Sequence, residues 1–293
     1  MNTAACAIGS TTNLDRYAVL GNPVAHSRSP FIHHRFAQQT GQALVYERLL
    51  CELHDFAPAV QRFAAAGGRG CNVTIPFKFE VPALATRCTP RALLAGAANV
   101  LRLDGADWLA DNTDGVGLVR DIEQGAGLAL AGLRVLLIGA GGAAAGVLGP
   151  LLQKQPAAVV VANRSADTAQ ALVARHAEWA AVHSARLSAC GLSAAAAQGA
   201  FDVVVNASAS SLQGAASPVA ADVLKPGCLA IDLMYGSASA PWLHWAEAQG
   251  ARPRDGLGML VEQAAEAFEL WRDVRPATAP VLAALRVELT AGR

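Results

Sequence analysis

The segment RVLLIGAGGAAAGVLGPLL at residues 134–152 decides the fold class. It begins with a short apolar run of strand length, continues through Gly139, Gly141 and Gly142, and ends in small residues that favour a helix. Glycines at this place let a pyrophosphate approach the amide groups of the helix N-terminus, where the helix dipole favours an anion. The segment predicts a dinucleotide-binding turn that includes Ala140 and Ala143. A glycine turn without a ligand is the alternative.

Downstream of this turn, apolar runs of strand length alternate with helical stretches. Strands are expected at residues 159–163, 201–207 and 228–234. The alanine-rich stretch 168–200 between them is expected to form surface helices. This alternation is typical of a doubly wound, Rossmann-like nucleotide-binding domain.

Upstream of the turn, the same alternation indicates a separate α/β domain. Strands are expected at 17–21, 43–50 and 70–76, with a helix from Pro30 and another at 55–66. Crossover helices between strands imply parallel pairing. Near the C-terminus, residues 256–274 have apolar side chains at three and four spacing, which predicts one long amphipathic helix that returns to the first domain.

Composition excludes several classes of function. The 293 residues suggest two domains, and 23 Lys+Arg against 23 Asp+Glu provide no basic excess for nucleic acid. The six cysteines form no CxxC, so no metal site is expected and the thiols are interpreted as reduced. Without a signal peptide or an apolar run of spanning length, the sequence predicts a cytoplasmic protein that does not bind a membrane. A small-molecule substrate is expected.

The residues after the second strand of the nucleotide-binding domain indicate which dinucleotide binds. An NAD-specific fold usually has Asp or Glu at this place, whereas Asn163, Arg164 and Ser165 stand here. A guanidinium can bind a 2′-phosphate with two hydrogen bonds, so NADP (NADPH) is predicted. The alternative is a solvated Arg164 with Ser165 as a helix N-cap, and Asp167 nearby favours some use of NAD.

Six ordered motifs carry a family resemblance: GNPVAHSRSP at 21–30, NVTIPFK at 72–78, AGAAN at 95–99, DNTDGVG at 111–117, GAGGA at 139–143 and GLGMLVEQA at 256–264. With these motifs, from about Tyr17 to Pro276, the sequence resembles the shikimate dehydrogenase family, which includes shikimate and quinate dehydrogenases. The resemblance implies a substrate-binding catalytic domain at 1–113 and 257–293, an NADP-binding Rossmann-like domain at 114–256, and an active site in the cleft between them. It also implies reversible reduction of 3-dehydroshikimate to shikimate by hydride transfer, in aromatic amino acid biosynthesis.

The resemblance assigns roles to individual residues. Lys78 and Asp114 match the catalytic pair. The implied substrate-binding residues are Ser27, Ser29, Thr74, Asn99, Tyr235 and Gln263. The implied cofactor-binding residues are Gly139, Ala140, Gly141, Gly142, Ala143, Asn163, Arg164, Ser165, Met234 and Gly256.

Elementary chemistry agrees with the catalytic pair. A hydride that arrives at a carbonyl carbon leaves developing alkoxide charge, and a lysine can stabilise this charge and donate a proton. Structural alternatives remain for each residue: Asp114 as a helix N-cap, Lys78 as a solvated residue, Ser27 and Ser29 as caps of the next helix. Gln263 and Tyr235 could likewise be core residues. Arg28 is expected to point away from both serines, because alternate residues of an extended segment face opposite sides.

Three departures from the family pattern and three other functions remain open. No second basic residue follows Arg164 within the next turn, which weakens the preference for NADP. Val100 stands where the family usually has Thr, which removes a hydroxyl near the expected pocket, and NASASSL at 206–212 varies the usual NATS pattern. The alternatives are an NAD-preferring quinate/shikimate dehydrogenase, a paralogue that acts on an aminated analogue, and a catalytically silent dinucleotide-sensing regulator. A monomer or a homodimer is expected.

Overall fold

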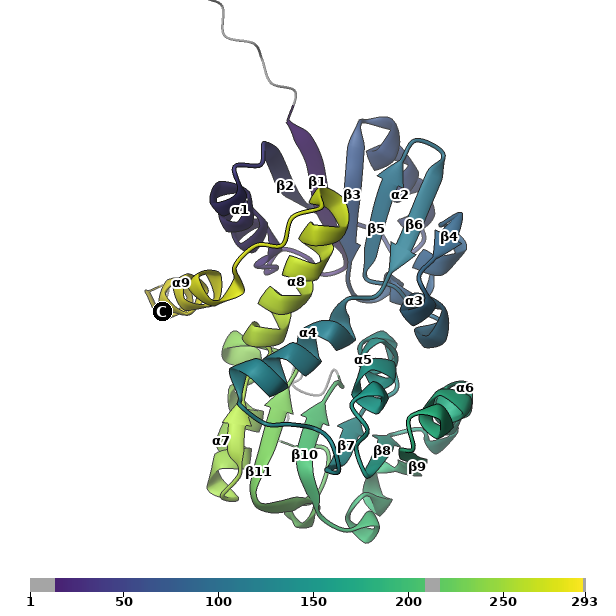
Figure 1. Ribbon diagram of the computed structural model, residues 1–293, viewed down its shortest axis with the longest axis vertical. Helices are drawn as coiled ribbons and strands as arrows, with labels where there is room; N and C mark the ends of the chain where they lie inside the picture. Colours follow the sequence, from purple (N-terminus) through teal and green to yellow (C-terminus); the bar gives the residue numbers. More distant parts are fainter. Residues whose placement is uncertain (1–13, 209–216, 292–293) are drawn as a thin grey trace, which may run out of the picture.

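A computed structural model describes residues 14–208 and 217–291 of the chain (Figure 1). The strands are β1 (Asp15–Gly21), β2 (Leu44–Leu50), β3 (Gly68–Val73), β4 (Arg87–Cys88), β5 (Val100–Asp104), β6 (Asp107–Asp111), β7 (Arg134–Ile138), β8 (Ala158–Asn163), β9 (Arg186–Gly191), β10 (Phe201–Asn206), β11 (Leu224–Asp232) and β12 (Arg252–Arg254). The helices are α1 (Ser29–Thr40), α2 (Phe56–Ala65), α3 (Pro90–Ala95), α4 (Asp114–Arg120), α5 (Gly142–Gln153), α6 (Ala166–Val182), α7 (Ala240–Ala248), α8 (Leu257–Arg272) and α9 (Thr278–Ala291).

The strands form two sheets, and the α/β fold predicted from the sequence is confirmed. The first sheet has six strands in the order β2-β1-β3-β5-β6-β4. Its first three strands are parallel, as expected, but β5 runs antiparallel to both β3 and β6. The prediction of parallel pairing throughout was wrong here, because β5 and β6 form a hairpin whose turn contains Gly105 with φ of 58°.

The second sheet is parallel throughout and has the order β12-β11-β10-β7-β8-β9. Counted from β7 as the first strand, this is the 3-2-1-4-5-6 order of a Rossmann fold. The order reverses between β7 and β10, and ligands of such sheets bind in the crevice beyond the strand ends at this point. The glycine turn that follows β7 lies there.

The alanine-rich stretch at 168–200 differs from its prediction. Only its first part is α-helical, in α6, which buries one face that includes Leu172 and Val173, while 192–194 and 196–198 form short 3-10 turns. Residues 186–191 instead form the edge strand β9, which pairs with β8. High alanine content favours a helix locally, but pairing with the open edge of the sheet outweighs that propensity here.

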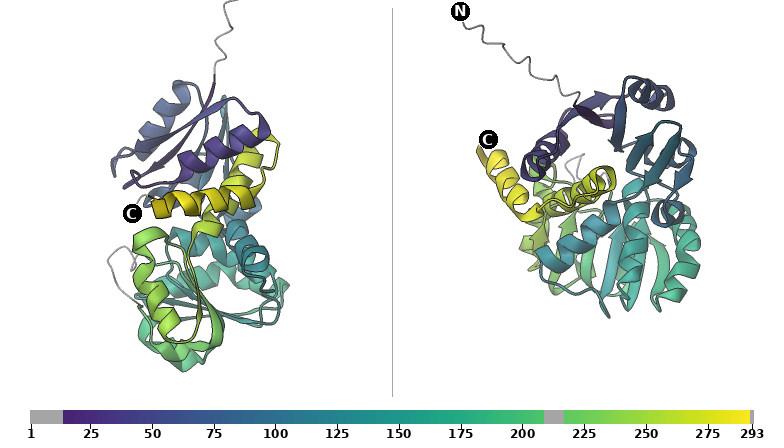
Figure 2. Two further views of the ribbon diagram at one scale, coloured as in Figure 1. Left: turned by 90° about the vertical axis from the view of Figure 1, so that its left-hand side faces the viewer. Right: turned by 45° about the horizontal axis from the view of Figure 1, so that its top comes forward.

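Helices α4 and α8 lie between the two sheets, and α9 lies against α1 (Figures 1 and 2). As expected, the helix over Leu257–Arg272 returns to the first sheet, where it shares one apolar cluster with α1 and α9. Leu118 and Ile122, from α4 and the π-helical turn after it, pack into the core of the second sheet. The domain boundaries given above remain a prediction.

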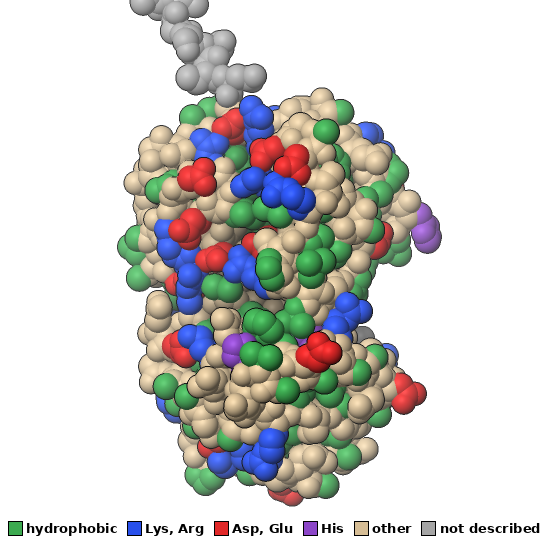
Figure 3. Space-filling view, turned by 45° about the vertical axis from the view of Figure 1, so that its right-hand side comes forward, with side chains coloured by type: hydrophobic (Ala, Val, Ile, Leu, Met, Phe, Trp, Pro, Cys, Tyr) green, Lys and Arg blue, Asp and Glu red, His purple; other side chains and the backbone are tan. Residues whose placement is uncertain are grey.

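The surface is mixed in charge. Acidic and basic side chains are interleaved on the face in Figure 3. The outline of the molecule narrows between two units, the first built on the sheet of β1–β6 and the second on the sheet of β7–β12. Within residues 14–208 and 217–291, no helix combines the length and the apolarity that crossing a membrane requires. The five cysteines in these ranges are all free.

His33 is a buried polar residue among aromatic side chains. Only 1% of it is exposed, and its ring stacks on Tyr46 at 4.2 Å between centroids. Neither ring nitrogen has a hydrogen-bond partner among the described residues. Burial lowers the pKa of His33 from 6.5 to about 3, and the nearby Asn72 side chain offsets only part of this shift. The folded protein therefore keeps this imidazole neutral.

We predict that His33 makes stability depend on pH. Because the unfolded chain takes up a proton on this imidazole that the folded chain does not, the free energy of unfolding should fall as pH decreases from 6.5 towards about 3. The variant His33→Phe should show a smaller slope than the wild type in urea titrations at a series of pH values, most clearly between about pH 6.5 and 5, above the range in which carboxylates with lowered pKa values titrate. The exposed neighbour His34, changed to Gln, is the control and should keep it. Equal slopes in both variants would contradict the prediction.

Candidate active site

A cleft of about 780 Å³ lies between the two sheets. It is lined from one side by the ends of β1 and β3, and from the other by the turn after β7 and the ends of β8 and β11. Every candidate residue singled out from the sequence lines this one cleft. Residues far apart in the sequence are thus brought together, with the expected catalytic pair between the expected substrate and cofactor residues.

Lys78 and Asp114 form a salt bridge inside the cleft. Lys78 Nζ lies 2.6 Å from Asp114 Oδ2, and the two side chains are only 12% and 6% exposed. Lys78 belongs to a single 3-10 turn, Phe77–Phe79, whereas Asp114 is the first residue of α4. Since the N-cap of α4 is Thr113 and not Asp114, and Lys78 is paired and mostly buried, both structural alternatives for these residues are wrong.

Asn99 joins the pair to the rest of the pocket. Its amide nitrogen lies 2.9 Å from Asp114 Oδ1 and 3.0 Å from Gln263 Oε1, and its amide oxygen accepts a hydrogen bond from the backbone of Thr113 at 2.8 Å. Gln263, on α8, also accepts from the Thr113 hydroxyl at 3.2 Å. This buried cluster fixes the Asp114 carboxylate, so that its other oxygen faces Lys78.

The two serines lie at the start of α1. Their hydroxyl oxygens are 3.2 Å apart. Ser27 Oγ also accepts a hydrogen bond from Ser29 N, the first amide of α1, at 3.3 Å, so Ser27 binds the start of the helix, whereas Ser29 makes no capping hydrogen bond. Arg28 between them instead binds Glu288 on α9 at 3.1 Å, away from the serines as predicted. Both serines line the cleft, together with Asn72 in β3 and Thr74 directly after that strand.

The glycine turn has the backbone that a close approach requires. Gly139 has φ of 107°, which glycine alone adopts readily, and a Cβ there would lie 3.1 Å from the Ala207 backbone. The position of a Cβ on Gly141, which precedes α5, meets nothing within 4 Å, so the space before this helix N-terminus is open. This arrangement suits the pyrophosphate of a dinucleotide.

The side chain of Lys78, from the domain of the first sheet, contacts the N-terminus of α5 in the domain of the second sheet. A Cβ on Gly142 would lie 3.0 Å from the Cβ of Lys78. The stem of the lysine therefore packs against the first residue of α5, although the two residues belong to different units. Any larger residue at position 142 would displace the lysine.

The end of β8 bears the residues expected to select the dinucleotide. Arg164 is exposed, lines the cleft, and has no ion pair with any described residue, while Thr168 lines the cleft one turn further on. Ser165 caps α6, since its hydroxyl accepts from Thr168 N at 3.4 Å, as the sequence suggested. Asn163 donates to the Ser165 carbonyl at 3.0 Å and so fixes this turn.

Three further candidates, Met234, Tyr235 and Gly256, lie after the end of β11 and before the start of α8. Gly256 N donates to Met234 O at 2.9 Å, which holds the start of α8 against the end of β11. Tyr235 follows directly, and burial raises the pKa of its hydroxyl. It also packs against the cluster shared by α1, α8 and α9, so it is at once a core residue and a cleft residue.

Two expectations about departures from the family pattern have different outcomes. Val100 is fully buried within β5, next to Asn99, and is not among the described residues that line the cleft, so its effect on recognition of a substrate hydroxyl stays a prediction. Ala207 and Ser208 of the NASASSL run line the cleft. Residues 209–212 of that run lie outside the described residues.

Among the polar residues of the site that were overlooked from the sequence, two lie within the motifs quoted above. Asn72 lines the cleft and accepts a hydrogen bond from the hydroxyl of the half-buried Tyr46 at 2.6 Å. Thr113 lies behind the cleft and binds both Asn99 and Gln263. In each case a polar residue within an otherwise apolar strand or strand end was the available signal.

Comparison with known proteins gives matches along most of the chain. The model of the shikimate dehydrogenase substrate binding domain matches residues 19–101, that of shikimate / quinate 5-dehydrogenase matches 121–232, and that of the shikimate 5′-dehydrogenase C-terminal domain matches 256–286. A curated shikimate dehydrogenase (NADP(+)) from Acidovorax sp. (strain JS42) is 60% identical over 282 residues, which cover 96% of this chain and 99% of the relative.

Solved structures of the same fold also include shikimate dehydrogenases. An Ael1 enzyme from Pseudomonas putida is 47% identical, with a TM-score of 0.82 over 92% of this chain and 98% of its own. A shikimate 5-dehydrogenase from Thermus thermophilus in complex with NADP(H) and shikimate is 30% identical, with a TM-score of 0.81 over 94% and 99% of the two chains. At this identity and coverage, the chain belongs to the shikimate dehydrogenase family.

Proposed function

We propose that this protein is an NADP-dependent oxidoreductase that interconverts 3-dehydroshikimate and shikimate in aromatic amino acid biosynthesis. The observation that carries the proposal is the Lys78–Asp114 salt bridge, which lies between the serine pair and the glycine turn in one cleft. The names of the relatives support the substrate and the cofactor. The cytoplasmic location and a monomer or homodimer remain predictions from the sequence.

The residues of the cleft fit NADP by position and charge. The open N-terminus of α5 offers amide groups to the pyrophosphate, and Arg164 offers a guanidinium, without an ion-pair partner among the described residues, to a 2′-phosphate. When bound, the nicotinamide supplies the hydride in reduction and accepts it in oxidation. Ser27 and Ser29 bind the substrate carboxylate in this proposal.

Lys78 handles the proton. As the carbonyl carbon of the substrate is reduced, negative charge develops on its oxygen, and the ammonium of Lys78 stabilises this charge and donates the proton. Asp114 holds the ammonium in place and accepts a hydrogen bond from a substrate hydroxyl, and the lysine regains its proton from solvent. In the oxidative direction the same groups act in reverse.

Initial rates test the function. We expect the highest kcat/KM for shikimate with NADP+, compared with quinate and with NAD+ in the four possible pairings. A preference for quinate with NAD+ would show an NAD-preferring quinate/shikimate dehydrogenase instead. No turnover in any pairing, with the dinucleotide still bound, would show a sensing regulator.

The variant Lys78→Met tests the chemistry. Methionine keeps much of the apolar stem but removes the ammonium, so kcat should fall at least about 100-fold while dinucleotide binding survives. Lys154→Met is the matched control, since Lys154 is paired with Glu123 at 2.7 Å and does not line the cleft. A kcat within about threefold of wild type, with a large rise in KM, would make Lys78 a residue for uniform binding.

The variant Arg164→Ala tests cofactor selection. Loss of a charge-assisted bidentate contact should cost on the order of 1.5–3 kcal/mol, so the Kd for NADP should rise roughly tenfold to 100-fold. Binding of NAD should change little. Arg186→Ala in the neighbouring strand β9 is the control, because Arg186 is exposed and lies outside the described lining of the cleft. Equal losses for both dinucleotides would place the 2′-phosphate elsewhere.

A further inference from the structure

Asp111 is a buried carboxylate that the proposed reaction does not use. It ends β6, is 1% exposed, and is not among the described residues that line the cleft. Its Oδ1 accepts from the Thr89 hydroxyl at 2.5 Å, from Arg91 Nε at 2.7 Å and from the backbone of Asn112 at 2.7 Å. Its Oδ2 accepts from Arg91 Nη2 at 2.5 Å. The carboxylate thus orients the backbone that enters α4.

Arg91 continues this network to a third element. While two of its nitrogens bind Asp111, its Nη1 lies 3.0 Å from Glu266 Oε1 on α8. Glu266 also accepts from Arg120 on α4 at 2.6 Å and from Arg275 at 2.9 Å. Burial would raise the pKa of Glu266, but hydrogen bonds from Arg120 and Arg91 lower it to about 2, so the carboxylate is ionised near neutral pH.

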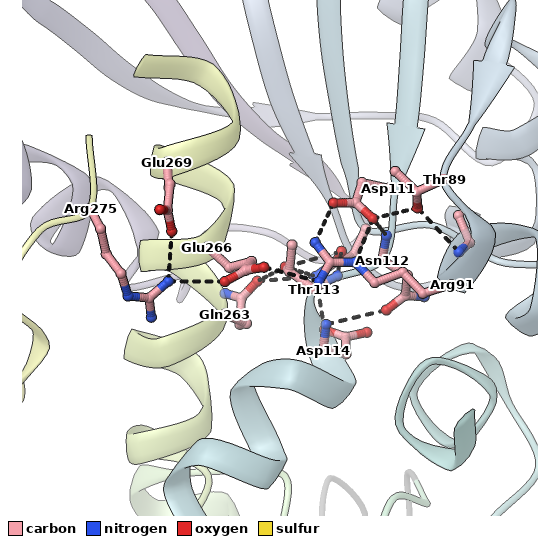
Figure 4. A network of polar contacts seen from close by, with 12 residues as sticks. Thr89, Arg91, Asp111, Asn112, Thr113, Asp114, Gln263, Glu266, Glu269 and Arg275 are labelled. Carbon is pink, nitrogen blue, oxygen red and sulfur yellow. Dashed lines mark hydrogen bonds and ion pairs between the residues drawn. The ribbon is translucent and has the colours of Figure 1, made fainter. Parts of the chain in front are cut away.

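The network of Asp111, Arg91 and Glu266 is connected to residues of the cleft at two places (Figure 4). Asp111 and Asp114 lie on one continuous segment, and Asn112 between them accepts from Asp114 N at 3.2 Å and donates to Ala97 O at 2.9 Å. On α8, Gln263 lies one turn before Glu266 and shares the Asn99 amide with Asp114. Both elements that hold the Asp114 carboxylate are therefore tied to the single guanidinium of Arg91.

We propose that Arg91 and Asp111 are positioning residues for the Lys78–Asp114 pair: their bidentate ion pair fixes the start of α4 so that Asp114 meets Lys78. The kinetic consequence of this inference rests on the proposed function. Its structural consequence, which is how readily the amine of Lys78 reacts, does not rest on the proposed function.

The chain contains a matched ion pair that lacks this connection. Arg87 binds Asp107 through two nitrogens, Nε at 3.1 Å and Nη2 at 2.5 Å, and joins β4 to the other end of β6. These side chains are 57% and 51% exposed, and neither contacts α4 or α8 by hydrogen bond among the described residues. The pair controls for the loss of an arginine that binds a carboxylate of the same strand, β6.

The first test is a double-mutant cycle. Arg91→Gln should lower kcat at least about tenfold, since a displacement of about 1 Å far from the reacting atoms can cost up to ~100-fold. Arg91→Lys should recover part of this loss, because it keeps the charge but not the planar fork. In the Lys78→Met background, with enzyme in excess of substrate, Arg91→Gln should change the rate less than about twofold.

The second test needs no substrate. The chain has only three lysines, Lys78, Lys154 and Lys225, and each forms an ion pair. Brief acetylation followed by peptide mass spectrometry gives the reaction rate of each amine. In Arg91→Gln, Lys78 should react roughly threefold faster or more, because its ion pair is loosened, whereas the other two lysines keep their rates. Arg87→Gln should change none of them.

The outcomes separate the possibilities. Inactive wild type with selective exposure of Lys78 in Arg91→Gln would disprove the proposed function and leave the positioning role standing. A rise at all three lysines, or a kinetic loss that persists in full without Lys78, would mean that Arg91 only stabilises the fold and would overturn the inference. If Arg91→Gln does not fold, Arg91→Lys should show the selective change instead: acetylation of Lys78 becomes faster, and that of Lys154 and Lys225 does not. The lysine introduced at position 91 is measured on a separate peptide. An unchanged Lys78 in that folded variant would also overturn it.

Discussion

The amide of Asn99 is the junction on which the site depends. It is 3% exposed, and it lies in hydrogen-bond contact with Thr113, Asp114 and Gln263, which come from the loop before α4, from α4 itself and from α8. An amide buried in this way must find its partners inside the protein, because an unsatisfied polar group costs about 1–3 kcal/mol. The carboxylate that faces Lys78 is therefore held by the same group that holds two helices together.

The contact between the two units has a chemical meaning. Because the stem of Lys78 rests on Gly142, the group that handles the proton is fixed against the helix that would bind the pyrophosphate. The first unit supplies the lysine and the second supplies the surface on which it lies. The distance between proton donor and dinucleotide thus depends on how the units pack, and α4 and α8 determine that packing.

Sequence reasoning found the parts of this molecule that have short-range signals. The glycine turn at 139–142, the apolar strands and the amphipathic α8 each have a local pattern that physics explains. The hairpin of β5 and β6 was missed although Asp104 and Gly105 form a familiar turn dipeptide, because alternation with helices elsewhere favoured a parallel sheet. Strand β9 was missed because its pairing energy comes from β8, which no window of alanine-rich sequence contains.

In the site, too, residues within local motifs were predicted and contacts between distant residues were not. The motifs identified Lys78 and Asp114, yet nothing local indicated that Asn99 would bind both Asp114 and Gln263, which is 164 residues away. The ion pairs of Arg91 were equally hidden, since one partner is 20 and the other 175 residues distant in the chain. Long side chains between separate elements form contacts that only the three-dimensional packing defines, so polar networks are the last feature that a sequence can reveal.

The apolar cluster of α1, α8 and α9 has a consequence for synthesis of the chain on the ribosome. Ile32 and Phe36 on α1 are fully buried, and their partners include Phe268 and Leu285, which are made more than two hundred residues later. The strands of the second sheet are all complete before α8 emerges, so that unit can form its own core first. Until the last helices arrive, the nascent first unit exposes the hydrophobic face of α1, and exposed surface of this kind promotes aggregation.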